Sequence, residues 1–542
     1  MNQTAGSAKK RVLILGGGHA GFRAAKRLLG LRKVSDNLEI VIASSETSEV
    51  YHGLMPQIVG GKVQARNVLV PLRNFLPGIV FYNYDVESID LEARQVTLDP
   101  KAERHKIILP YDYLVIALGS VTDLSRFPGL QEHGLQTKTI GDVYYLHDHL
   151  LEMLEKASTE ENQLERKRLL TVVIVGAGYA GIEIGAEANN LLRTALRFYP
   201  NIRVEELSVS IISSTDRILN SMHKSLADSA SRHLMKKGVH IRLSTSVLSA
   251  SAGEVILSTG ERIATRTVIV TAGIAPNPVV QDLPLQRERG RIKTDEFCGV
   301  AGYPGVYAIG DIAAVPHFKT GQACPTTFLY AFTQGMQAAG NIIADVRGKN
   351  PKQYRFSNFG DVAQLGNTFG LIQFFGIPFS GFAASLLVRL VFFLVVPSWR
   401  CRLGLLADWT SALTMPPDVS QMKISRTDLI VRLRFAAGQE IIRQGEPGSR
   451  FYIVNSGNVE VVRTNGDQEE RLAVLGPGKY FGEVALLQSS MRTATVRALE
   501  DTVVLSIERK DFTVLVESLP VLAEAMSETV RRSIAVATGE VS

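Results

Sequence analysis

Cysteine is scarce in this sequence, and the few cysteines are scattered. The 542 residues contain three of them, Cys298, Cys324 and Cys401, which lie far apart. This spacing provides no disulfide framework and fits a reducing compartment. The sequence also lacks a Cys-x-x-Cys pair, which argues against an enzyme that works through a redox-active disulfide.

Several other signals are missing as well. The ten histidines show no metal-ligand spacing, so no metal site is predicted. The net charge of +6 favours anionic surfaces only mildly, and no basic run with interleaved aromatic residues predicts binding to nucleic acid. The start, MNQTAGSAKKRVLIL, has no long apolar core before a cleavage site, so we expect a short disordered lead rather than a signal peptide.

What is present indicates a large α/β protein. A chain of 542 residues should hold three or four domains, and 45% hydrophobic residues can fill sizeable cores. Strand and helix patterns alternate over residues 11–118 and again up to about 282, and another apolar strand follows at 305–311. This order predicts a first α/β domain that is interrupted by a second one and resumes after it.

Two glycine-rich fingerprints carry most of the functional signal. Each follows a short apolar strand (residues 12–15 and 171–175) and opens into a helical pattern. The first glycine permits the tight turn, the second lets a pyrophosphate approach the backbone, and the third lets helix and strand pack closely. Two such motifs predict two nucleotides held face to face, most simply FAD and NAD(P)H. The glycines are Gly16, Gly18 and Gly21 in the first set and Gly176, Gly178 and Gly181 in the second.

The ribose-binding acid of such sites is not where it is usually found. In the first unit that position falls near Ala43 or Ser44, and Glu46 is the nearest acid. In the second unit it falls at Ser213. A missing carboxylate there removes the repulsion of a 2′-phosphate, and Arg217 is suited to pair with one. NADH is favoured, and NADPH stays open.

With these motifs in place, residues 11 to about 410 resemble a type II NADH dehydrogenase, a single-chain flavoenzyme that passes electrons from NADH to a membrane quinone. The resemblance implies that Asp311 accepts a hydrogen bond from the FAD ribityl chain, where a helix N-cap is the alternative role. It places Glu183 near the nicotinamide and the flavin as the catalytic residue, where an exposed helix carboxylate is the alternative. It also assigns cofactor contacts to the turns after three apolar strands, at Ala117, Gly119, Gly273 and Gly310.

The quinone side departs from the family pattern. The family often has Ala-Gln, three residues and another Gln, where this chain has Phe328, Leu329 and then Thr333. A lysine common in the next segment is Phe359 here. Apolar residues can line a slot for an isoprenoid quinone, but they remove the polar groups expected to hold its carbonyls.

A nearly continuous apolar stretch runs from residue 377 to 399, interrupted by Arg389. A spanning helix, a buried core or dimer helix, and an interfacial amphipathic anchor are the three alternatives. We favour the anchor because a spanning helix needs about 20 apolar residues, a central arginine costs a few kcal/mol there, and Pro378 and Pro397 bracket the run closely. Arg400 and Arg402 would then meet anionic head groups, and Trp399 and Trp409 suit the head-group level.

The C-terminal part resembles a cyclic nucleotide-binding domain, a small β-barrel module with a terminal helix. The stretch FGEVALLQSSMRTA matches the family's phosphate cassette. By this resemblance, Gly482 lies among amides that cradle the cyclic phosphate, Glu483 accepts the ribose 2′-hydroxyl, and Arg492 pairs with the phosphate. Thr493 does not decide between cAMP and cGMP. An ordinary β-barrel with a surface Arg–Glu pair is the alternative.

The predicted fold class is therefore α/β, with two Rossmann-like domains, a membrane-associating helical segment and a small β-barrel. The predicted boundaries are 1–125 and 286–350 for the FAD domain, 126–285 for the NAD(P)H domain, 351–415 for the membrane segment, 416–425 for a linker and 426–542 for the barrel module.

The predicted function is electron transfer from NAD(P)H to a membrane quinone without proton pumping, tuned by a cyclic nucleotide. We expect a peripheral enzyme on the cytoplasmic face of the inner (plasma) membrane, and a homodimer stays open because both resembled families commonly pair. The alternatives are a soluble reductase of a small electron-carrier protein and an inactive cyclic-nucleotide sensor.

Overall fold

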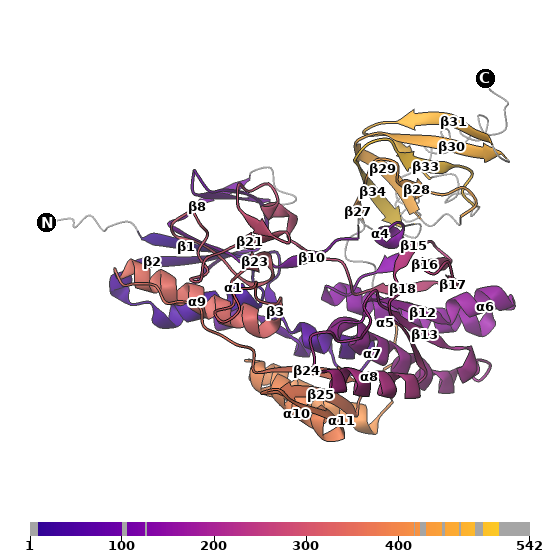
Figure 1. Cartoon of the computed structure of the whole chain (residues 1–542), viewed down its shortest axis with the longest axis horizontal. Coiled ribbons are helices and arrows are strands. Elements are labelled where there is room, and N and C mark those ends of the chain that lie inside the picture. The colour runs from indigo at the N-terminus through magenta and orange to yellow at the C-terminus, as the bar shows by residue number, and fades with distance from the viewer. Residues whose placement is uncertain are drawn as a thin grey trace. The chain divides into compact units, whose positions relative to one another are not determined.

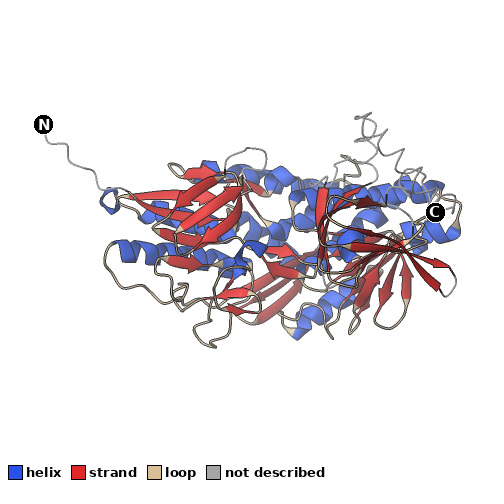
Figure 2. Cartoon of the chain, turned by 90° about the horizontal axis from the view of Figure 1, so that it is seen from above, coloured by secondary structure: helices blue, strands red, loops and turns tan. Residues whose placement is uncertain are grey.

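A computed structural model describes residues 9–99, 106–124, 127–416, 418–422, 430–446, 450–465, 468–482 and 491–508 (Figures 1 and 2). The chain divides into two compact units. Unit 1 comprises residues 1–55, 63–122 and 274–415, and unit 2 comprises residues 56–62, 123–273 and 416–542. The predicted terminal helix falls on residues 509–542, which lie outside the described residues.

Unit 1 is built on a five-stranded parallel sheet. Its central strands are short runs rich in Val, Ile and Leu that are buried on both faces, as is typical of parallel sheets, while the edge strand at residues 80–82 is partly exposed. The last strand in sequence, β22 (Val306–Ala308), pairs with β9 (Tyr113–Ile116), so the chain returns to this sheet after leaving it for about 150 residues of unit 2. In order across the sheet the strands are β22 (Val306–Ala308), β9 (Tyr113–Ile116), β1 (Lys10–Leu15), β2 (Leu38–Ala43) and β5 (Val80–Tyr82).

Two helices of unit 1, α1 (His19–Leu31) and α9 (Phe328–Val346), lie side by side and share the apolar core of this sheet (Figure 1). The same core includes residues of the antiparallel sheet β6 (Asp85–Asp90), β7 (Gln95–Asp99) and β8 (Ile107–Pro110). Smaller elements complete this part of the unit: β3 (Ser48–Val50), β4 (Leu69–Pro71), α3 (Leu72–Phe75), β10 (Ser120–Thr122), β19 (Ile274–Pro276), β20 (Arg287–Glu288), β21 (Arg291–Lys293) and β23 (Ala313–Ala314). The short helix α2 (Met55–Val59) belongs to unit 2 from its second residue on.

The apolar stretch near residue 380 does not form one helix. It begins as β26 (Ile377–Gly381), which pairs with β25 (Phe369–Phe374) beside β24 (Gly360–Leu365). Helix α10 (Phe382–Val395) follows, and α11 (Trp399–Thr414) comes after a break. The break falls at Pro397, because proline holds the preceding Val396 in an extended conformation.

Unit 2 contains a second five-stranded parallel sheet, in which the fingerprint strand again has the next two strands on one side and a later strand on the other. The edge strand beyond that later strand differs, since it comes first in the chain in unit 2 and last in unit 1. Its strands are β11 (Gly134–Leu135), β18 (Thr267–Val270), β12 (Thr171–Val175), β13 (Ser208–Ile212) and β14 (Val239–Arg242). Its helices are α4 (Leu130–His133), α5 (Ile140–Thr159), α6 (Gln163–Leu169), α7 (Tyr179–Ala195) and α8 (Lys224–Lys236), and β15 (Val247–Ala250), β16 (Glu254–Leu257) and β17 (Arg262–Ala264) form a small antiparallel sheet.

The described C-terminal part of unit 2 consists of strands and turns (Figure 2). One antiparallel sheet has the order β27 (Ile430–Phe435), β34 (Thr502–Glu508), β29 (Arg450–Ser456), β32 (Tyr480–Phe481). The other has the order β28 (Glu440–Ile442), β33 (Thr495–Ala498), β30 (Val459–Asn465), β31 (Gln468–Leu475). Their inner residues share one apolar core, so this part is a small β module with its own interior.

Candidate functional site

The first fingerprint forms the turn between β1 and α1. Gly16 has φ +103°, and a β-carbon there would lie 2.3 Å from the Ala117 carbonyl oxygen. A β-carbon on Gly21 would lie 2.0 Å from the Gly16 carbonyl oxygen, so helix and strand approach as closely as glycine allows. Around Gly18, by contrast, nothing lies within 4 Å of that position, and no side chain caps the helix. The turn therefore leaves open space and uncapped amides where a pyrophosphate would sit.

The second fingerprint repeats this geometry between β12 and α7. Gly176 has φ +113°, and a β-carbon on Gly181 would lie 2.0 Å from the Gly176 carbonyl oxygen. Gly178 again faces open space at an uncapped helix start. Both units thus present a phosphate cradle of the same construction.

Asp311 lies at the carboxyl end of β22, in the short turn that begins at Gly310. Its Oδ2 accepts a hydrogen bond from Ser120 Oγ at 3.0 Å, and Gly310 N donates to Gln334 Oε1 at 2.8 Å. Asp311 lines a hollow of about 390 Å³ together with Ser120, Arg289, Arg291 and Cys324. Gly119 and Gly310 both have positive φ, +68° and +75°, at the turns that end β9 and β22. The polar groups at this edge of the sheet suit a ligand that extends here from the glycine turn between β1 and α1.

In unit 2, Glu183 lies on α7 and is buried, which excludes the alternative of an exposed helix carboxylate. Gly273 has φ +81° after β18, at the equivalent of Gly119. Ser213 is buried at the end of β13, and its hydroxyl lies 2.8 Å from Thr215 Oγ1. Arg217 is half-buried and donates to the Asn220 carbonyl at 2.7 Å. In unit 1, the candidate Glu46 is exposed beyond β2.

The residues predicted for quinone lie on α9 and before β24. The Phe328 ring contacts His19 edge-on, with a centroid separation of 4.5 Å, and lies 6.1 Å from the Tyr51 ring. Leu329 is half-buried one residue further along α9, and its carbonyl accepts the Thr333 hydroxyl at 2.7 Å.

Thr333 and Phe359 have partners of their own. The Thr333 hydroxyl also lies 2.7 Å from Tyr354 Oη, so it is already engaged on two sides. Phe359 is 43% exposed and packs with Phe374 and Phe375. The structure therefore brings Phe328 to a polar cluster and leaves Phe359 in an aromatic surface group.

This polar cluster was not predicted from the sequence. Glu49 on β3 is fully buried, and its two oxygens contact His19 Nδ1 at 2.8 Å and the Tyr51 hydroxyl at 3.2 Å. Burial, and next the charge of Glu49, raise the pKa of Tyr51. The Tyr51 hydroxyl also lies 3.4 Å from the Val395 carbonyl at the end of α10. The only sequence signal for this cluster was His19 inside the first fingerprint.

The three cysteines are all buried and unpaired. Burial raises the pKa of Cys298 and raises that of Cys324 to about 11. Since the thiolate is the reactive form, burial disfavours reaction at both side chains.

Helices α10 and α11 expose an unusual amount of apolar surface. On α10 the exposed residues include Phe382, Leu386, Leu390 and Leu394. Arg389 faces inward and donates to the Asn367 carbonyl at 2.7 Å, so it does not interrupt this face. Among the described residues, no helix has the length and apolar character needed to cross a bilayer.

In the C-terminal module, Arg492 is buried and donates to the carbonyls of Gly482 at 2.8 Å and Arg450 at 2.7 Å. Gly482 has φ +87°, and Thr493 is exposed. Among the described residues these bonds occupy two of the five N–H donors of the guanidinium. Glu483 lies outside the described residues.

The same module contacts the rest of unit 2 beside Arg492. The Tyr452 ring stacks on Phe481 and lies under the Arg492 guanidinium, and its hydroxyl donates to the buried carboxylate of Glu132 on α4. Burial, and next the charge of Glu132, raise the pKa of Tyr452. Tyr452 therefore connects Arg492, the residue predicted to bind the phosphate, with Glu132 on α4.

Comparisons with known proteins match both parts. Residues 10–338 match the family described as pyridine nucleotide-disulphide oxidoreductase, and residues 432–518 match the cyclic nucleotide-binding domain. Demethylphylloquinone reductase NdbB from Synechocystis is 30% identical over 416 residues, which cover 76% of this chain and 97% of that relative. The type II NADH:quinone oxidoreductase of Staphylococcus aureus is 23% identical over 390 residues, 71% of this chain and 94% of that one.

Among solved structures, NDH2 from Plasmodium falciparum in complex with NADH superimposes with a TM-score of 0.70 at 18% identity. The alignment covers 76% of this chain and all of that one, which shows a common fold.

Proposed function

Because the chain belongs to the pyridine nucleotide-disulphide oxidoreductase family and joins it to a cyclic nucleotide-binding domain, we propose that it is a FAD-dependent NAD(P)H:quinone oxidoreductase. The carrying observation is the pair of open phosphate cradles at Gly18 and Gly178. A quinone is the proposed acceptor because the two sequence relatives described above are named quinone reductases. A disulfide acceptor within the chain is disfavoured because all three cysteines are buried and lie far apart.

Each of the two glycine turns would bind a different dinucleotide. Gly16, Gly18 and Gly21 with the start of α1 would hold the FAD pyrophosphate, and Asp311 would accept from its ribityl hydroxyls. The equivalent glycines before α7 would hold the nicotinamide dinucleotide, and Glu183 would act near the nicotinamide. When bound, FAD supplies hydride acceptance and electron transfer, while the protein supplies position and electrostatics.

Quinone reduction also consumes protons, and the described residues offer a source beside Phe328. His19, Glu49 and Tyr51 form a connected set of titratable groups, and the first and last of them contact the Phe328 ring. We infer that Phe328 packs against the quinone ring while this cluster holds the protons. Thr333 has two partners already and would contribute packing with Leu329, and Phe359 would contact the isoprenoid tail.

The nicotinamide preference follows from the loop after β13. No acid stands at Ser213, so nothing at that position repels a 2′-phosphate. Arg217 would have to leave the Asn220 carbonyl to pair with one. We therefore propose NADH as the preferred donor, with NADPH also accepted.

The membrane role rests on α10 and α11. A continuous apolar face on α10, with Arg389 turned inward, suits a helix lying in the bilayer interface. The C-terminal end of α10 contacts Tyr51, so a quinone dissolved in lipid would reach Phe328 next to this helix. We propose peripheral association, on the cytoplasmic face of the inner (plasma) membrane.

Regulation by a cyclic nucleotide is supported by the module's family match and by the Tyr452–Glu132 contact. A bound phosphate would draw the Arg492 guanidinium away from the Tyr452 ring. Because the Tyr452 hydroxyl donates to Glu132, this shift would change the contact between the module and α4. Such coupling is typically about 1–3 kcal/mol. Turnover and Michaelis constants measured with and without cAMP or cGMP test it, and identical values under all conditions contradict it.

The deciding experiment is an acceptor screen on the purified full-length protein. We expect a yellow protein that bleaches anaerobically on adding NADH, more slowly with NADPH, and that is reoxidised by a short-chain quinone. Reoxidation by a ferredoxin or a cytochrome, and not by quinone, would show a reductase of carrier proteins instead. A protein that retains no flavin under excess FAD would overturn the proposal and leave a nucleotide sensor.

Two glycine variants sharpen the test. In Gly21→Ala the new methyl collides with the Gly16 carbonyl, so both flavin and stability should be lost. In Gly18→Ala the methyl meets open space, so the fold should survive while flavin affinity falls, because the methyl enters the space left for the pyrophosphate.

A further inference from the structure

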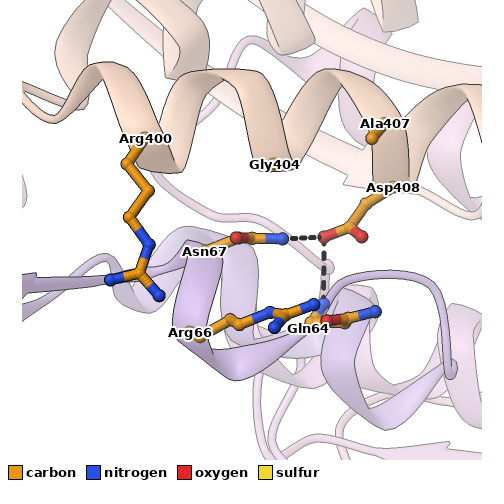
Figure 3. A pocket seen from close by; sticks show the side chains of 7 residues that line it. All are labelled: Gln64, Arg66, Asn67, Arg400, Gly404, Ala407 and Asp408. Atoms are coloured by element: carbon orange, nitrogen blue, oxygen red, sulfur yellow. Dashed lines mark hydrogen bonds between the residues drawn. The ribbon is translucent and has the colours of Figure 1, made fainter.

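A small hollow in unit 1 belongs to none of the sites above. It has a volume of about 290 Å³, close to the lower end of small-molecule sites at about 300–1,000 Å³. One wall is α11, and the other is the short helical turn at residues 65–67 (Figure 3). The lining residues are Gln64, Arg66, Asn67, Arg400, Gly404, Ala407 and Asp408.

The two walls are held together by a close contact. Asp408 on α11 accepts hydrogen bonds from Asn67 Nδ2 at 2.7 Å and from Gln64 N at 3.0 Å, as the dashed lines in Figure 3 show. A β-carbon on Gly404 would lie 2.1 Å from Asn67 Oδ1, so any larger residue there would have to displace the Asn67 side chain. The hollow is therefore a built feature of the fold, and its one carboxylate is engaged with the wall.

Two arginines remain at the hollow. Arg400 extends from α11 toward the turn that carries Arg66 (Figure 3). Within the part of the chain that the structure describes, neither guanidinium has a hydrogen bond or an ion pair. Arg402, two residues further on, behaves differently, since it donates to the carbonyls of Val396 and Leu394 at the end of α10. The sequence predicts that Arg400 and Arg402 act together at head groups, whereas in the structure Arg400 lines the hollow together with Arg66.

The position of the hollow on α11 is informative. Trp399, Leu403, Leu406 and Leu413 recur at helical spacing and are exposed, so one face of α11 is an apolar surface. Arg400, Gly404 and Ala407 each follow one of these residues, which places the hollow about 100° round the helix from that face. If the apolar face enters a bilayer, the hollow lies at its edge, at the depth of the head groups.

We propose that Arg66 and Arg400 bind the exposed phosphomonoester of an anionic lipid head group, as in phosphatidic acid, and not the choline-covered phosphate of phosphatidylcholine. Planar guanidinium groups form paired hydrogen bonds to phosphate oxygens and are the side chains best suited to this geometry. The lipid source is favoured over a free phosphate because the exposed apolar face of α11 directly adjoins the hollow. This inference rests on the peripheral membrane association proposed above, and it adds a defined lipid contact to it.

The test is vesicle co-sedimentation of the full-length flavin-loaded protein. The vesicles contain phosphatidylcholine alone or with phosphatidic acid, and the variant is Arg66→Gln/Arg400→Gln. A matched control is Arg27→Gln/Lys349→Gln, which removes two positive charges at exposed positions of the same unit. We expect the pocket variant to bind phosphatidic acid vesicles about tenfold more weakly than the control variant. Binding to phosphatidylcholine alone should stay equal.

Three outcomes overturn the inference. Equal loss in both variants would show that net charge alone attracts the protein. Wild-type binding that is no stronger with phosphatidic acid than with phosphatidylcholine alone would exclude the exposed lipid phosphate as the ligand. Glycerol phosphate in solution that competes at millimolar concentration would assign the site to a free phosphate. If the wild type binds no vesicle of either kind while reducing a short-chain quinone in detergent, the membrane association itself has failed, and that result is distinct from failure of the pocket.

A second variant keeps the test informative should the double substitution unfold the protein. In Gly404→Ala, the methyl displaces the Asn67 side chain or α11, and so disturbs the hydrogen bond from Asn67 to Asp408, without changing any charge. We expect it to weaken phosphatidic acid binding while its affinity for phosphatidylcholine vesicles stays that of the wild type. Unchanged phosphatidic acid binding in a folded Gly404→Ala protein counts against the pocket.

Discussion

His19 Nδ1 lies 2.8 Å from Oε1 of Glu49, a carboxylate with no exposed surface on a strand 30 residues away. The other oxygen of Glu49 accepts the Tyr51 hydroxyl. A buried carboxylate persists only when its oxygens are paired, and these contacts pair both. Through Glu49, His19 at the start of α1 is connected to Tyr51, which contacts both the Phe328 ring and the end of α10.

Glu49→Gln is expected to slow quinone reduction more than flavin reduction. The amide keeps the shape of the carboxylate but cannot carry the proton or the charge, so reoxidation by quinone should fall by about 10²-fold or more. Stopped-flow measurement of the two half-reactions separates the steps.

Tyr51→Phe serves as the companion variant, because it removes one hydrogen bond and leaves the His19 contact. An equal slowing of both half-reactions in Glu49→Gln would indicate a purely structural cluster.

Replacing Arg389 tests the orientation of α10. Arg389→Leu removes the hydrogen bond to the Asn367 carbonyl and is expected to cost about 1–3 kcal/mol of unfolding free energy, measured by urea denaturation. Vesicle affinity should not change, because the side chain is buried. A marked rise in affinity for phosphatidylcholine vesicles would mean that Arg389 faces lipid, which would contradict the described helix. Leu390→Gln on the exposed face is the matched control and should weaken vesicle binding.

Arg492→Gln is expected to abolish cyclic nucleotide binding measured by calorimetry. It should also destabilise the module, since the carbonyls of Gly482 and Arg450 lose their donor. Arg492→Lys keeps the charge but not the planar fork, so it should retain only weak binding. Full affinity in Arg492→Lys would show that charge alone holds the phosphate.

The Asp36–Arg347 pair predicts a dependence on acid. Both Asp36 oxygens accept from the Arg347 guanidinium, at 3.0 and 2.7 Å, and this hydrogen bonding lowers the pKa of Asp36 to about 2. A lowered pKa in the folded state contributes stability above the unfolded value of about 3.9, and this contribution disappears as the pH falls toward 2.

Asp36→Asn should therefore be less stable than the wild type at pH 6, and the difference should shrink between pH 4 and pH 2. Urea midpoints across this range measure it. Asp282→Asn, at an exposed position, should show no such dependence. A gap between wild type and Asp36→Asn that persists at pH 2 would mean that the carboxylate is not the titrating group.

Much of the fold was accessible from local patterns. The two fingerprints predicted both α/β folds, because a tight turn at Gly16 and close packing at Gly21 are requirements that a few neighbouring residues reveal. The type II NADH dehydrogenase resemblance and the cyclic nucleotide-binding module are confirmed by the family matches and relatives. The apolar run at residues 377–399 was harder to interpret, since hydropathy does not show that β26 pairs with β25 or that Arg389 turns inward.

The roles proposed for individual site residues stay predictions, and the structure adds contacts that the sequence did not predict. Thr333 is predicted to line the quinone pocket, but its hydroxyl lies 2.7 Å from that of Tyr354, 21 residues further on. Arg492 was expected to face a phosphate, yet it already donates to two carbonyls. Neither contact follows from spacing along the chain.

The sequence alone determined the two strand–glycine–helix turns and the module of the cyclic nucleotide-binding family, because glycine turns and apolar strands act over a few residues. Only the tertiary structure decided that Glu49 meets His19, and that Arg66 and Arg400 share one hollow. The chain positions that frame this hollow lie up to 344 residues apart, as in the contact of Gln64 with Asp408. Such pairings depend on how helices and strands pack, and packing arises from the summed burial of side chains throughout a unit.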